Sequence, residues 1–529
     1  FTQARPAGAA PGTNQTARSN ILAYDLTTGA LITSWAPSLN AQGLEIKASA
    51  DGTTIYVGGD FDQVSGQSRK RIAAIDAQSG ALRSWNPGAN SRVDSITTTG
   101  NTVYFGGDFT SVGSPSVGRT RLAAANATTG AILPWAPAAD RRVSAMVFHP
   151  GSGRLIVSGT FSTLNGTQQL GMGSLHGVTG AVQPWPVNTI IKNHLDSASI
   201  GSLATDGQKV YGVGWTYLQG GTNGNFEGAF AADAATGALD WVDGGRGDNY
   251  DIAVTGNVLY IVGHPHDWGM LAWNPQTNPW TWQRAMAIDK RRSPTLTNAF
   301  GTPGTWQHFK GRPAAQPLLW LPTLSGGTYT GQGQAAWSVD TNGNYVVLGG
   351  EFPRVNGVNQ QGLVRFAKRS ISPSVDPIQG YPELKPVVTA LGPGRVRLAW
   401  TAAYDRDNAR LTFEVLRGST VLKTFQTDDT TWWNRPPLGF LDTTATPGST
   451  QTYRIRVTDP FGNGFAGPTT TVTIPAGAPT PSPYAAAVLA DKPAWQWRLG
   501  EASGTKAYDR AGSNDVTLHS ANARNIAGA

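Results

Sequence analysis

Short runs of alternating apolar and polar residues recur along the first 370 positions, and most of them end in glycine. The clearest runs are rich in Tyr and Val and end in Gly-Gly-Asp-Phe or a close variant, at 55–61, 103–109, 155–161 and 345–352. Alternation with a period of two is typical of half-buried β-strands. No run of 18 apolar residues occurs, so we expect no membrane span. The pattern therefore predicts an all-β protein.

A second motif alternates with the first one. Four tryptophans follow one another at intervals of 50 residues, each after a turn of the Asp-x-x-Thr-Gly type or a variant of it: Trp35, Trp85, Trp135 and Trp185. In such a turn the Asp or Asn side chain caps the backbone and the glycine takes a positive φ. Four strands in a repeat of about 50 residues are typical of a β-propeller blade. We predict six blades over 18–370, with seven as the alternative, and a ring in which a strand near Ile21 joins the sheet of 345–352.

Shorter regions flank the repeats on both sides. Residues 1–17 are polar and rich in Ala and Gly, and we expect an N-terminal extension there. Residues 371–383 are predicted to be a linker, and the regularly spaced strand patterns of 384–475 predict an immunoglobulin-like sandwich. Residues 476–483 form a Pro-rich linker, and 484–529 are expected to be the incomplete start of a further domain.

The Gly-Gly-Asp-Phe copies and the Thr-Gly…Trp copies resemble those of a group of large secreted actinobacterial proteins. In that group a propeller of such repeats precedes fibronectin type III or PKD-like modules and a laminin-G/concanavalin-like jelly roll. The resemblance implies a fibronectin type III module at 384–475, with Trp400 in its core and Tyr453 as its corner tyrosine. It also implies that 484–529 open a laminin-G-like jelly roll, and that the protein is extracellular, either released or attached to the cell surface.

Composition narrows the chemistry. The chain has no cysteine, which excludes disulfides, thiolate metal sites and a cysteine nucleophile. Its net charge of +7 is too diffuse to argue for nucleic acid as a partner. We expect no cofactor, with calcium as the one candidate ion, because carboxylate oxygens suit it; turn capping is the alternative explanation for the same acids. The candidate calcium ligands are Asp405, Asp407 and Asp459.

The repeat lapses for about 40 residues, at 276–316. This segment carries six Lys or Arg residues against one Asp, interleaved with aromatic residues. Aromatic rings stack on sugar faces and guanidinium groups bind carboxylate or phosphate, so we predict that ligand specificity lies here, in solvated cations. A loop that only caps the propeller is the alternative. Together with the Gly-His-Pro-His-Asp-Trp cluster that precedes it, the predicted ligand-binding residues are His264, His266, Asp267, Trp268, Trp280, Trp282, Arg291, Arg292, Trp306 and His308.

These observations favour a binding or adhesion protein over an enzyme. The expected partner is a polysaccharide, a cell-wall polymer or another surface protein. The tripeptide Arg246-Gly-Asp248 is an integrin-type motif that also arises by chance in Gly-rich turns. A carbohydrate lyase or hydrolase is an alternative, although the sequence identifies no facing pair of carboxylates. Self-assembly into an extracellular structure is a further alternative.

Overall fold

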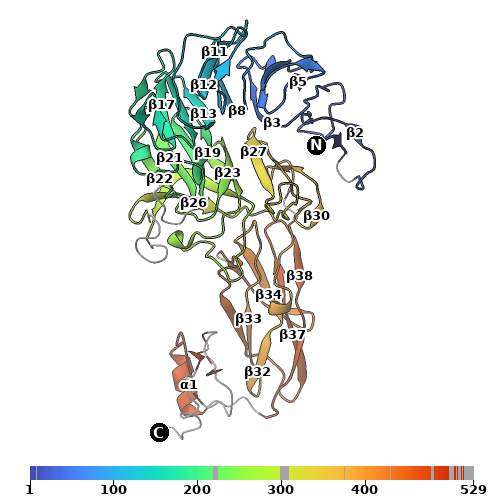
Figure 1. Cartoon of the computed structure of the whole chain (residues 1–529). Coiled ribbons are helices and arrows are strands. Elements are labelled where there is room, and N and C mark those ends of the chain that lie inside the picture. The colour runs from blue at the N-terminus through green and yellow to red at the C-terminus, as the bar shows by residue number, and fades with distance from the viewer. Residues whose placement is uncertain are drawn as a thin grey trace. The chain divides into compact units, whose positions relative to one another are not determined.

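The structure is a computed structural model. It describes residues 1–529 except 7–8, 218–223, 298–308, 374–375, 429, 478–481, 498, 500–505, 508, 510–513, 515 and 518–529. Nearly all of its regular structure consists of small antiparallel sheets, which confirms the prediction of an all-β protein. The chain forms two compact units, Phe1–Ile371 and Ser372–Ala529 (Figure 1). Among the described residues, no helix has the length and apolar character that crossing a membrane requires.

Among the described residues of Phe1–Ile371, six sheets of three or four strands follow one another along the chain. The first has β3 (Gly43–Ala48), β4 (Thr54–Gly59) and β7 (Ile72–Asp76), and the second has β8 (Val93–Thr99), β9 (Thr102–Gly107) and β12 (Leu122–Asn126). The third has β13 (Val143–His149), β14 (Arg154–Gly159), β17 (Met172–His176) and β18 (Val182–Gln183), and the fourth has β19 (Ala198–Thr205), β20 (Lys209–Thr216), β21 (Gly228–Asp233) and β22 (Leu239–Val242). The fifth has β23 (Asn249–Thr255), β24 (Val258–Gly263), β25 (Ala285–Thr295) and β26 (Pro313–Leu318), and the sixth has β27 (Ala336–Thr341), β28 (Tyr345–Gly350) and β31 (Leu363–Ala367).

The first strands of these sheets lie side by side in chain order, β3 against β8, then β13, β19, β23 and β27 (Figure 1). Small two-stranded hairpins follow the second strand of several sheets. They are β5 (Gln63–Val64) with β6 (Gln67–Ser68), β10 (Ser111–Val112) with β11 (Val117–Gly118), β15 (Thr163–Leu164) with β16 (Thr167–Gln168), and β29 (Arg354–Val355) with β30 (Val358–Asn359). Two short 3-10 helices, η1 (Pro186–Thr189) and η2 (Gly269–Leu271), lie in connecting segments.

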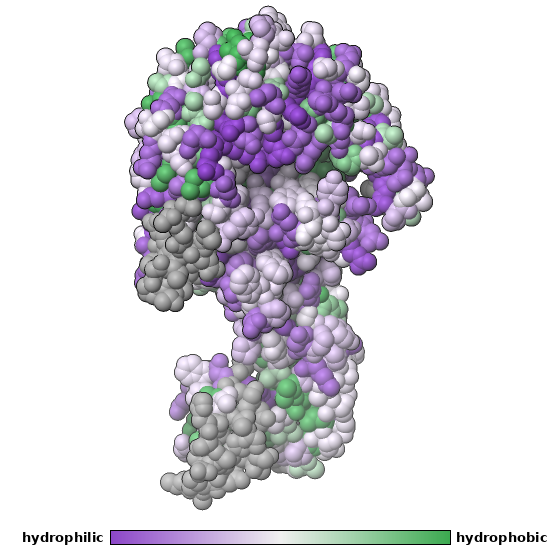
Figure 2. Space-filling model, in the orientation of Figure 1, coloured by the Kyte–Doolittle hydropathy of each residue, from purple (hydrophilic) through white to green (hydrophobic). Residues whose placement is uncertain are grey.

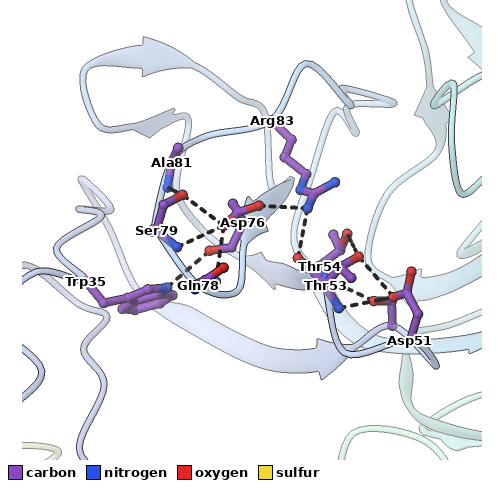
Figure 3. A network of polar contacts seen from close by, with 10 residues as sticks. Trp35, Asp51, Thr53, Thr54, Asp76, Gln78, Ser79, Ala81 and Arg83 are labelled. Atoms are coloured by element: carbon purple, nitrogen blue, oxygen red, sulfur yellow. Dashed lines mark hydrogen bonds and ion pairs between the residues drawn. The ribbon is translucent and has the colours of Figure 1, made fainter.

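The two sequence motifs meet in space, which explains their common period. In the first sheet, Asp76 Oδ1 accepts a hydrogen bond of 2.8 Å from the backbone N–H of Ser79 and so caps the turn (Figure 3). Arg83 donates to the other carboxylate oxygen of Asp76 over 2.8 Å. Trp35, from the preceding repeat, donates through Nε1 to the backbone oxygen of Asp76 over 3.2 Å (Figure 3). Trp85 and Trp135 donate in the same way to the backbone oxygens of Asn126 and His176, so these three tryptophans each tie their own repeat to the turn of the next one.

The glycine pair at the end of the second strand lets neighbouring sheets approach closely. A Cβ added at Gly58 would lie 2.8 Å from Val93 Cγ1 of the second sheet, which is closer than real Cβ contacts. At Gly106 a Cβ would lie 2.7 Å from Val143 Cγ1 of the third sheet. Neither glycine has a positive φ, so backbone conformation does not require glycine at these two positions. Glycine is required because the neighbouring sheet leaves no room for a Cβ.

The predicted pairing between the strand near Ile21 and the hairpin at 345–352 is wrong. Tyr24 forms an isolated bridge with Leu31, and β28 pairs with β27 and β31. Residues 1–17 carry regular structure of their own, because β1 (Gln3–Ala4) pairs with β2 (Thr16–Ala17). The N-terminal residues thus form a hairpin of the same size as those after β4 and β9, where the sequence suggested an extension.

The segment 276–316 is also more regular than its sequence suggested. Its first part forms β25, which pairs with β24 on one side and with β26 on the other. The apolar start of β25 is buried: Ala285, Met286, Ala287 and Ile288 are each at most 2% exposed. Where the sequence suggested a break in the repeat, the structure therefore has the third strand of the fifth sheet. Residues 298–308, which follow this strand, lie outside the described residues.

Ser372–Ala529 contains two facing sheets and a short helix. One sheet has β32 (Val387–Gly392), β33 (Arg395–Thr401) and β36 (Pro437–Asp442), and the other has β35 (Thr420–Thr427), β34 (Leu411–Arg417), β37 (Thr450–Thr458) and β38 (Gly464–Ala466), with β39 (Thr470–Thr473) on β37. The 3-10 helix η3 (Pro382–Leu384) precedes them, and Trp400 and Tyr453 are buried in their shared core. The helix α1 (Pro483–Ala490) and the two-residue strands β40 (Lys506–Ala507) and β41 (Val516–Thr517) follow, so the described residues after 483 start with a helix and not with a jelly-roll strand.

Candidate functional site

One end of the fifth sheet gathers polar and aromatic side chains. Asp248 directly precedes β23, His264 directly follows β24, and Arg284 directly precedes β25. Because the three strands are antiparallel, the start of β23, the end of β24 and the start of β25 lie at the same end of the sheet. Gln334 lies two residues before β27 of the sixth sheet and contributes to the same end.

Hydrogen bonds join these side chains into one cluster. The Tyr250 hydroxyl and His264 Nδ1 are 2.8 Å apart, and Gln334 Oε1 lies 3.2 Å from the same nitrogen. Arg284 donates to Gln334 Oε1 over 2.5 Å. The Trp337 ring packs against that of Tyr250 with centroids 4.5 Å apart. We call the set Asp248, Tyr250, His264, Arg284, Gln334 and Trp337 the rim cluster.

His264 is neutral at pH 7. Burial, with the nearby charge of Arg284, lowers the pKa of its ring to about 4. Its Nε2 lies 3.7 Å from Asp248 Oδ2, so the two groups approach each other without forming an ion pair at neutral pH. Burial also raises the pKa of the Asp248 carboxyl to about 6, and the pKa of the tyrosine hydroxyl of Tyr250 is raised by burial and by Asp248.

A second carboxyl lies beside Asp248. Glu227, directly before β21, accepts a hydrogen bond of 2.7 Å from the backbone N–H of Gly247. Burial, with the charge of Asp248, raises the pKa of Glu227 to about 7. Asp248 of the rim cluster and Glu227 beside it are therefore two carboxyls that take up protons more readily than ordinary Asp and Glu, which is the property required of a general acid.

Exposed tryptophan rings flank the rim cluster. Trp280 and Trp282 are 45% and 47% exposed, which is unusual for side chains of this size. Trp280 stacks on His266 with ring centroids 4.2 Å apart at 19°. The guanidinium of Arg284 lies 5.4 Å from the ring of Trp282. His266 and Arg284 thus pack against the two rings, and about half of each tryptophan side chain stays exposed to solvent, where a ligand can bind.

The residues of the predicted histidine cluster have three different surroundings. His264 joins the rim cluster, whereas His266 is 5% exposed beneath Trp280, with Nδ1 lacking a hydrogen-bond partner. Asp267 accepts a hydrogen bond of 2.8 Å from the N–H of Gly269 and so shapes its own loop. Trp268 is 0% exposed, which assigns it to packing and corrects its prediction as a ligand contact.

The predicted basic patch is not at this end of the sheet. The start of β24 pairs with β25 at Asp289, which lies opposite Val258. Arg291 and Arg292 follow Asp289 and so lie towards the opposite end of the sheet from the rim cluster. Arg291 lies six positions along the strand from Ala285, which is about 20 Å at the rise of a β-strand. Arg291 forms an ion pair with Asp289, and Arg292 Nη1 lies 3.9 Å from Asp240 Oδ1. The predicted mixture of cations and aromatic rings is thus divided between two ends of the sheet, which corrects it, while Trp306 and His308 lie outside the described residues.

The candidate calcium ligands do not form one site. Asp405 Oδ1 accepts from the N–H of Asp407 within one turn, whereas Asp459 Oδ1 accepts from the N–H groups of Phe461 and Asn463 in another. Burial and the neighbouring Asp407 raise the pKa of Asp405 to about 7. Across the part of the chain that the structure describes, no group of three or more His, Asp or Glu could hold a metal ion. The backbone hydrogen bonds place Asp405 and Asp459 as turn caps, whereas Asp407 Oδ1 accepts from the side-chain amide of Asn408.

Ser372–Ala529 also has a cavity, of about 650 Å³. Strands β33 and β36 line one side of it, and Trp495 and Trp497 of the C-terminal segment line the other. The rings of these two residues stack with centroids 6.2 Å apart, and Trp497 Nε1 donates to Asn514 O over 2.6 Å. The polar groups that would bind a ligand are fewer here than in the rim cluster, so the cavity is explained by the docking of the C-terminal segment on the sheet.

Sequence reasoning missed most of the rim cluster. In the sequence Asp248 stands out only within the Arg-Gly-Asp tripeptide, and at 6% exposure it is too buried for an integrin-type contact. The signal was present in the repeats themselves. Arg92 stands before β8 and Asp60 stands after β4, and these two residues form an ion pair between sheets. The fifth sheet has an acid, Asp248, at the first of these positions and a histidine, His264, at the second.

Comparisons with known proteins supply no family. No family model matches the chain, and no curated protein matches it. Among solved structures, the computationally designed Ika8 protein has a TM-score of 0.33 and 11% identity, over 80% of this chain and 95% of that chain. The computationally designed Ika4 protein has a TM-score of 0.23 and 14% identity, over 33% of this chain and 88% of that chain.

Proposed function

We propose that the protein binds a polysaccharide at the rim cluster and acts as a secreted or cell-surface adhesion protein. One observation carries this proposal: two half-exposed tryptophan rings, Trp280 and Trp282, flank a partly buried set of carboxyl, amide and guanidinium groups. Aromatic rings offer a flat apolar surface for the C–H face of a sugar, and the polar groups beside them match its hydroxyls. The combination fits a sugar chain better than it fits a purely charged polymer.

The charge at the rim cluster favours a neutral sugar. The cations Arg291 and Arg292 lie at the other end of the sheet, and Asp248 and Glu227 are acidic. An anionic polymer would meet the guanidiniums of Arg284 and Arg246 against these two carboxyls and that of Asp267, from which Arg246 Nη1 lies 3.8 Å. The expectation of an anionic ligand at 276–316 is therefore replaced by a neutral or weakly charged polysaccharide.

The surrounding architecture is part of the same proposal. Six successive small sheets with their first strands side by side support a β-propeller for Phe1–Ile371. The face of this unit that Figure 2 shows is largely hydrophilic and hollowed near its middle. The two sheets of 384–475 support a fibronectin type III module that serves as a spacer. We place this protein beside the secreted actinobacterial group that its repeats resemble.

Affinity electrophoresis tests the binding. The parent protein is run through gels containing a neutral β-glucan, a neutral galactomannan or polygalacturonate, and we expect retardation by a neutral polymer. Replacing Trp280 and Trp282 together with Ala should abolish the retardation, because both stacking rings are lost. The matched control replaces Arg291 and Arg292 with Ala; these residues lie on β25, away from the rim cluster, and this variant should be retarded like the parent. Equal retardation of both variants would refute the site.

A carbohydrate-active enzyme is the second candidate, and one observation favours it. The carboxyls of Glu227 and Asp248 have pKa values raised to about 7 and about 6, beside the Tyr250–His264 hydrogen bond. Such groups could protonate a leaving sugar oxygen or accept a proton from a sugar carbon. If the protein cleaves the polymer it binds, Glu227→Gln should lose turnover and keep retardation in the gel. If no polymer is cleaved by the parent protein, binding is the whole activity.

A further inference from the structure

The first 35 residues repeat the second half of the units that follow them. Asn20 N donates to Phe1 O over 3.1 Å, as Arg71 N donates to Phe61 O over 2.8 Å. Asn20 and Arg71 both have a positive φ, 61° and 69°. Phe1 therefore occupies the position of the Phe in the Gly-Gly-Asp-Phe motif.

A second set of contacts confirms this equivalence. Arg18 donates through Nη2 to the backbone oxygen of Thr33 over 2.9 Å, and Arg69 donates in the same way to that of Arg83 over 2.9 Å. Trp35 then bonds to the turn of the first sheet, as Trp85 bonds to that of the second. Residues 1–35 are thus the later half of a repeat.

What this half repeat lacks is a leading hairpin, by which we mean the first two strands of a sheet, such as β3 and β4. In the first sheet, Phe61 comes two residues after the end of β4, with Asp60 between. Residues 1–35 contain a hairpin of the small type, β1 with β2, and the bridge of Tyr24 with Leu31. A complete repeat would place two further strands on the inner side of these elements.

The first sheet has an apolar face that is bare where this hairpin would lie. Ile46 of β3 is 56% exposed. The residues at the same register position in four other first strands are at most 6% exposed: Ile96, Met146, Ile252 and Val339. Ile96 is buried because it packs towards Gly58 of the preceding sheet, where a Cβ would lie 3.3 Å from its Cδ1. Ile46 has the side chain for such a contact and no sheet to make it with.

The sixth sheet has the complementary bare face. Gly349 is the counterpart of Gly58, yet the nearest atom to an added Cβ there is Ser338 Cβ of its own sheet, at 4.0 Å. Val347 and Leu363 are half-buried, whereas their counterparts Tyr56 and Ile72 are 3% and 0% exposed.

The half repeat lies between these two faces. Ile21 and Trp35 pack into the core of the first sheet. On the other side, Arg365 of β31 donates to the backbone oxygen of Leu26, and Arg5 donates to Gln361 Oε1 over 3.4 Å. The bare faces of the first and sixth sheets therefore border one and the same half-built unit.

We propose that these two faces are the docking site of one antiparallel β-hairpin that carries the pattern of the leading hairpins: alternating Val, Ile and Tyr positions that end in Gly-Gly-Asp. The occupant is specified by the repeats, because the five interfaces between successive sheets each contain a leading hairpin, and those of β8–β9 and β27–β28 end in Gly-Gly-Asp and Gly-Gly-Glu. The bound hairpin would cover Ile46. The Gly-Gly pair of its second strand would pack against the first sheet, and its first strand would pack against Gly349 of the sixth sheet. This inference does not depend on the polysaccharide site.

Thiol labelling tests the proposal, because the chain has no cysteine of its own. Ile46→Cys introduces a single thiol at the bare face, and Val178→Cys, at an 82% exposed turn position, is the matched control. A copy of residues 93–108, which comprises the leading hairpin of the second sheet, is fused directly before Phe1, so that its last residue stands where Asp60 stands before Phe61. A fusion with the same residues in scrambled order is compared with it.

We expect the ordered hairpin to slow labelling of the Ile46→Cys variant by about tenfold or more, since labelling then requires local opening, and to leave the Val178→Cys variant unchanged. The synthetic hairpin added as a free peptide should protect the thiol of the Ile46→Cys variant in a saturable way. Gly349→Ala in the fusion should restore labelling, because the new Cβ occupies the space of the docked strand.

Equal labelling of the Ile46→Cys variant with ordered and scrambled hairpins would overturn the proposal. So would protection of its thiol that needs no hairpin and rises with protein concentration, since a second copy would then cover the face.

Discussion

At the residue scale, the repeated tryptophans divide into those with a partner for the indole N–H and one without. Trp85 is 3% exposed and its Nε1 donates to the backbone oxygen of Asn126 over 2.9 Å. Trp185 is 2% exposed, and its Nε1 has no hydrogen-bond partner among the residues that the structure describes. A buried donor without a partner costs free energy, while a buried hydrogen bond contributes about 1 kcal/mol. The two sites are thus alike in packing and different in hydrogen bonding.

We expect Trp85→Phe to lower the free energy of unfolding by roughly 1–2 kcal/mol more than Trp185→Phe, because the first removes a buried hydrogen bond and the second removes a buried donor that has no partner in the described part of the chain. The Asn126 oxygen keeps the hydrogen bond from the N–H of Gly130 over 2.9 Å in either case. Both variants lose similar ring volume, so each is the control of the other. Urea denaturation followed by circular dichroism measures the difference. A loss for Trp185→Phe that equals or exceeds that for Trp85→Phe would show that the hydrogen bond contributes nothing.

Burial of Asp243 makes the free energy of unfolding depend on pH, with higher stability at low pH. It is 1% exposed, and burial raises the pKa of its carboxyl to about 6, although the N–H groups of Ala229 and Gly245 donate to it over 3.0 Å each. A folded-state pKa above the ordinary value means that folding favours the protonated form. The stabilising contribution is complete below about pH 4 and is lost as the pH rises through 6.

Asp243→Asn should remove this dependence and keep an acceptor for the two N–H groups. Measured against the parent protein, its free energy of unfolding should rise by roughly 1–3 kcal/mol between pH 4 and pH 7. Asp76→Asn is the control of opposite sign, because the N–H of Ser79 lowers the pKa of Asp76 to about 2 and its contribution is lost as the pH falls. Parallel pH profiles for the parent and Asp243→Asn would contradict the assignment.

At the scale of the elements, the same glycine has different surroundings in different sheets. Gly106 ends a strand that packs against the third sheet, and a Cβ there would lie 2.7 Å from both Met146 Cε and Val143 Cγ1. Gly349 has the same place in the sixth sheet with open space before it. We expect Gly106→Ala to destabilise by about 1–3 kcal/mol through overpacking, and Gly349→Ala to stay within about 0.5 kcal/mol of the parent.

Thermal unfolding of the two glycine variants measures this contrast. Equal destabilisation would mean that the face of Gly349 is already covered. A neutral Gly106→Ala would mean that neighbouring sheets can separate without cost, in conflict with the close packing of β9 against β13.

The sequence predicted the strands whose two motifs are intact, and missed those whose pattern is interrupted. The Tyr/Val runs and the Trp-bearing turns indicate β4, β9 and β28, because alternation and turn chemistry agree there. In β25 a short buried run is followed directly by Asp289-Lys-Arg-Arg292. These charged residues interrupt the alternating pattern, so the sequence did not predict a core strand there. The rim cluster was hidden for another reason: its residues are far apart in sequence, and only the antiparallel pairing brings Asp248, His264 and Arg284 to one end.

At the scale of the whole molecule, the cores of the two units share no residues. The described cluster around Trp400 and Tyr453 draws only on Ser372–Ala529. The other described clusters draw only on Phe1–Ile371. Cooperative unfolding requires shared packing, so each unit should unfold as a separate transition.

Two single substitutions can assign these transitions. The Tyr453 hydroxyl is buried and donates to Asp442 Oδ2 over 2.7 Å, so Tyr453→Phe removes one hydrogen bond from the second unit and leaves the first untouched. Trp85→Phe does the same to the first unit. In scanning calorimetry we expect two transitions, with each variant lowering the midpoint of one of them by roughly 2–8 °C and leaving the other in place. A single transition that both variants shift would mean that the two units fold as one body, and that the packing within each unit does not by itself determine its stability.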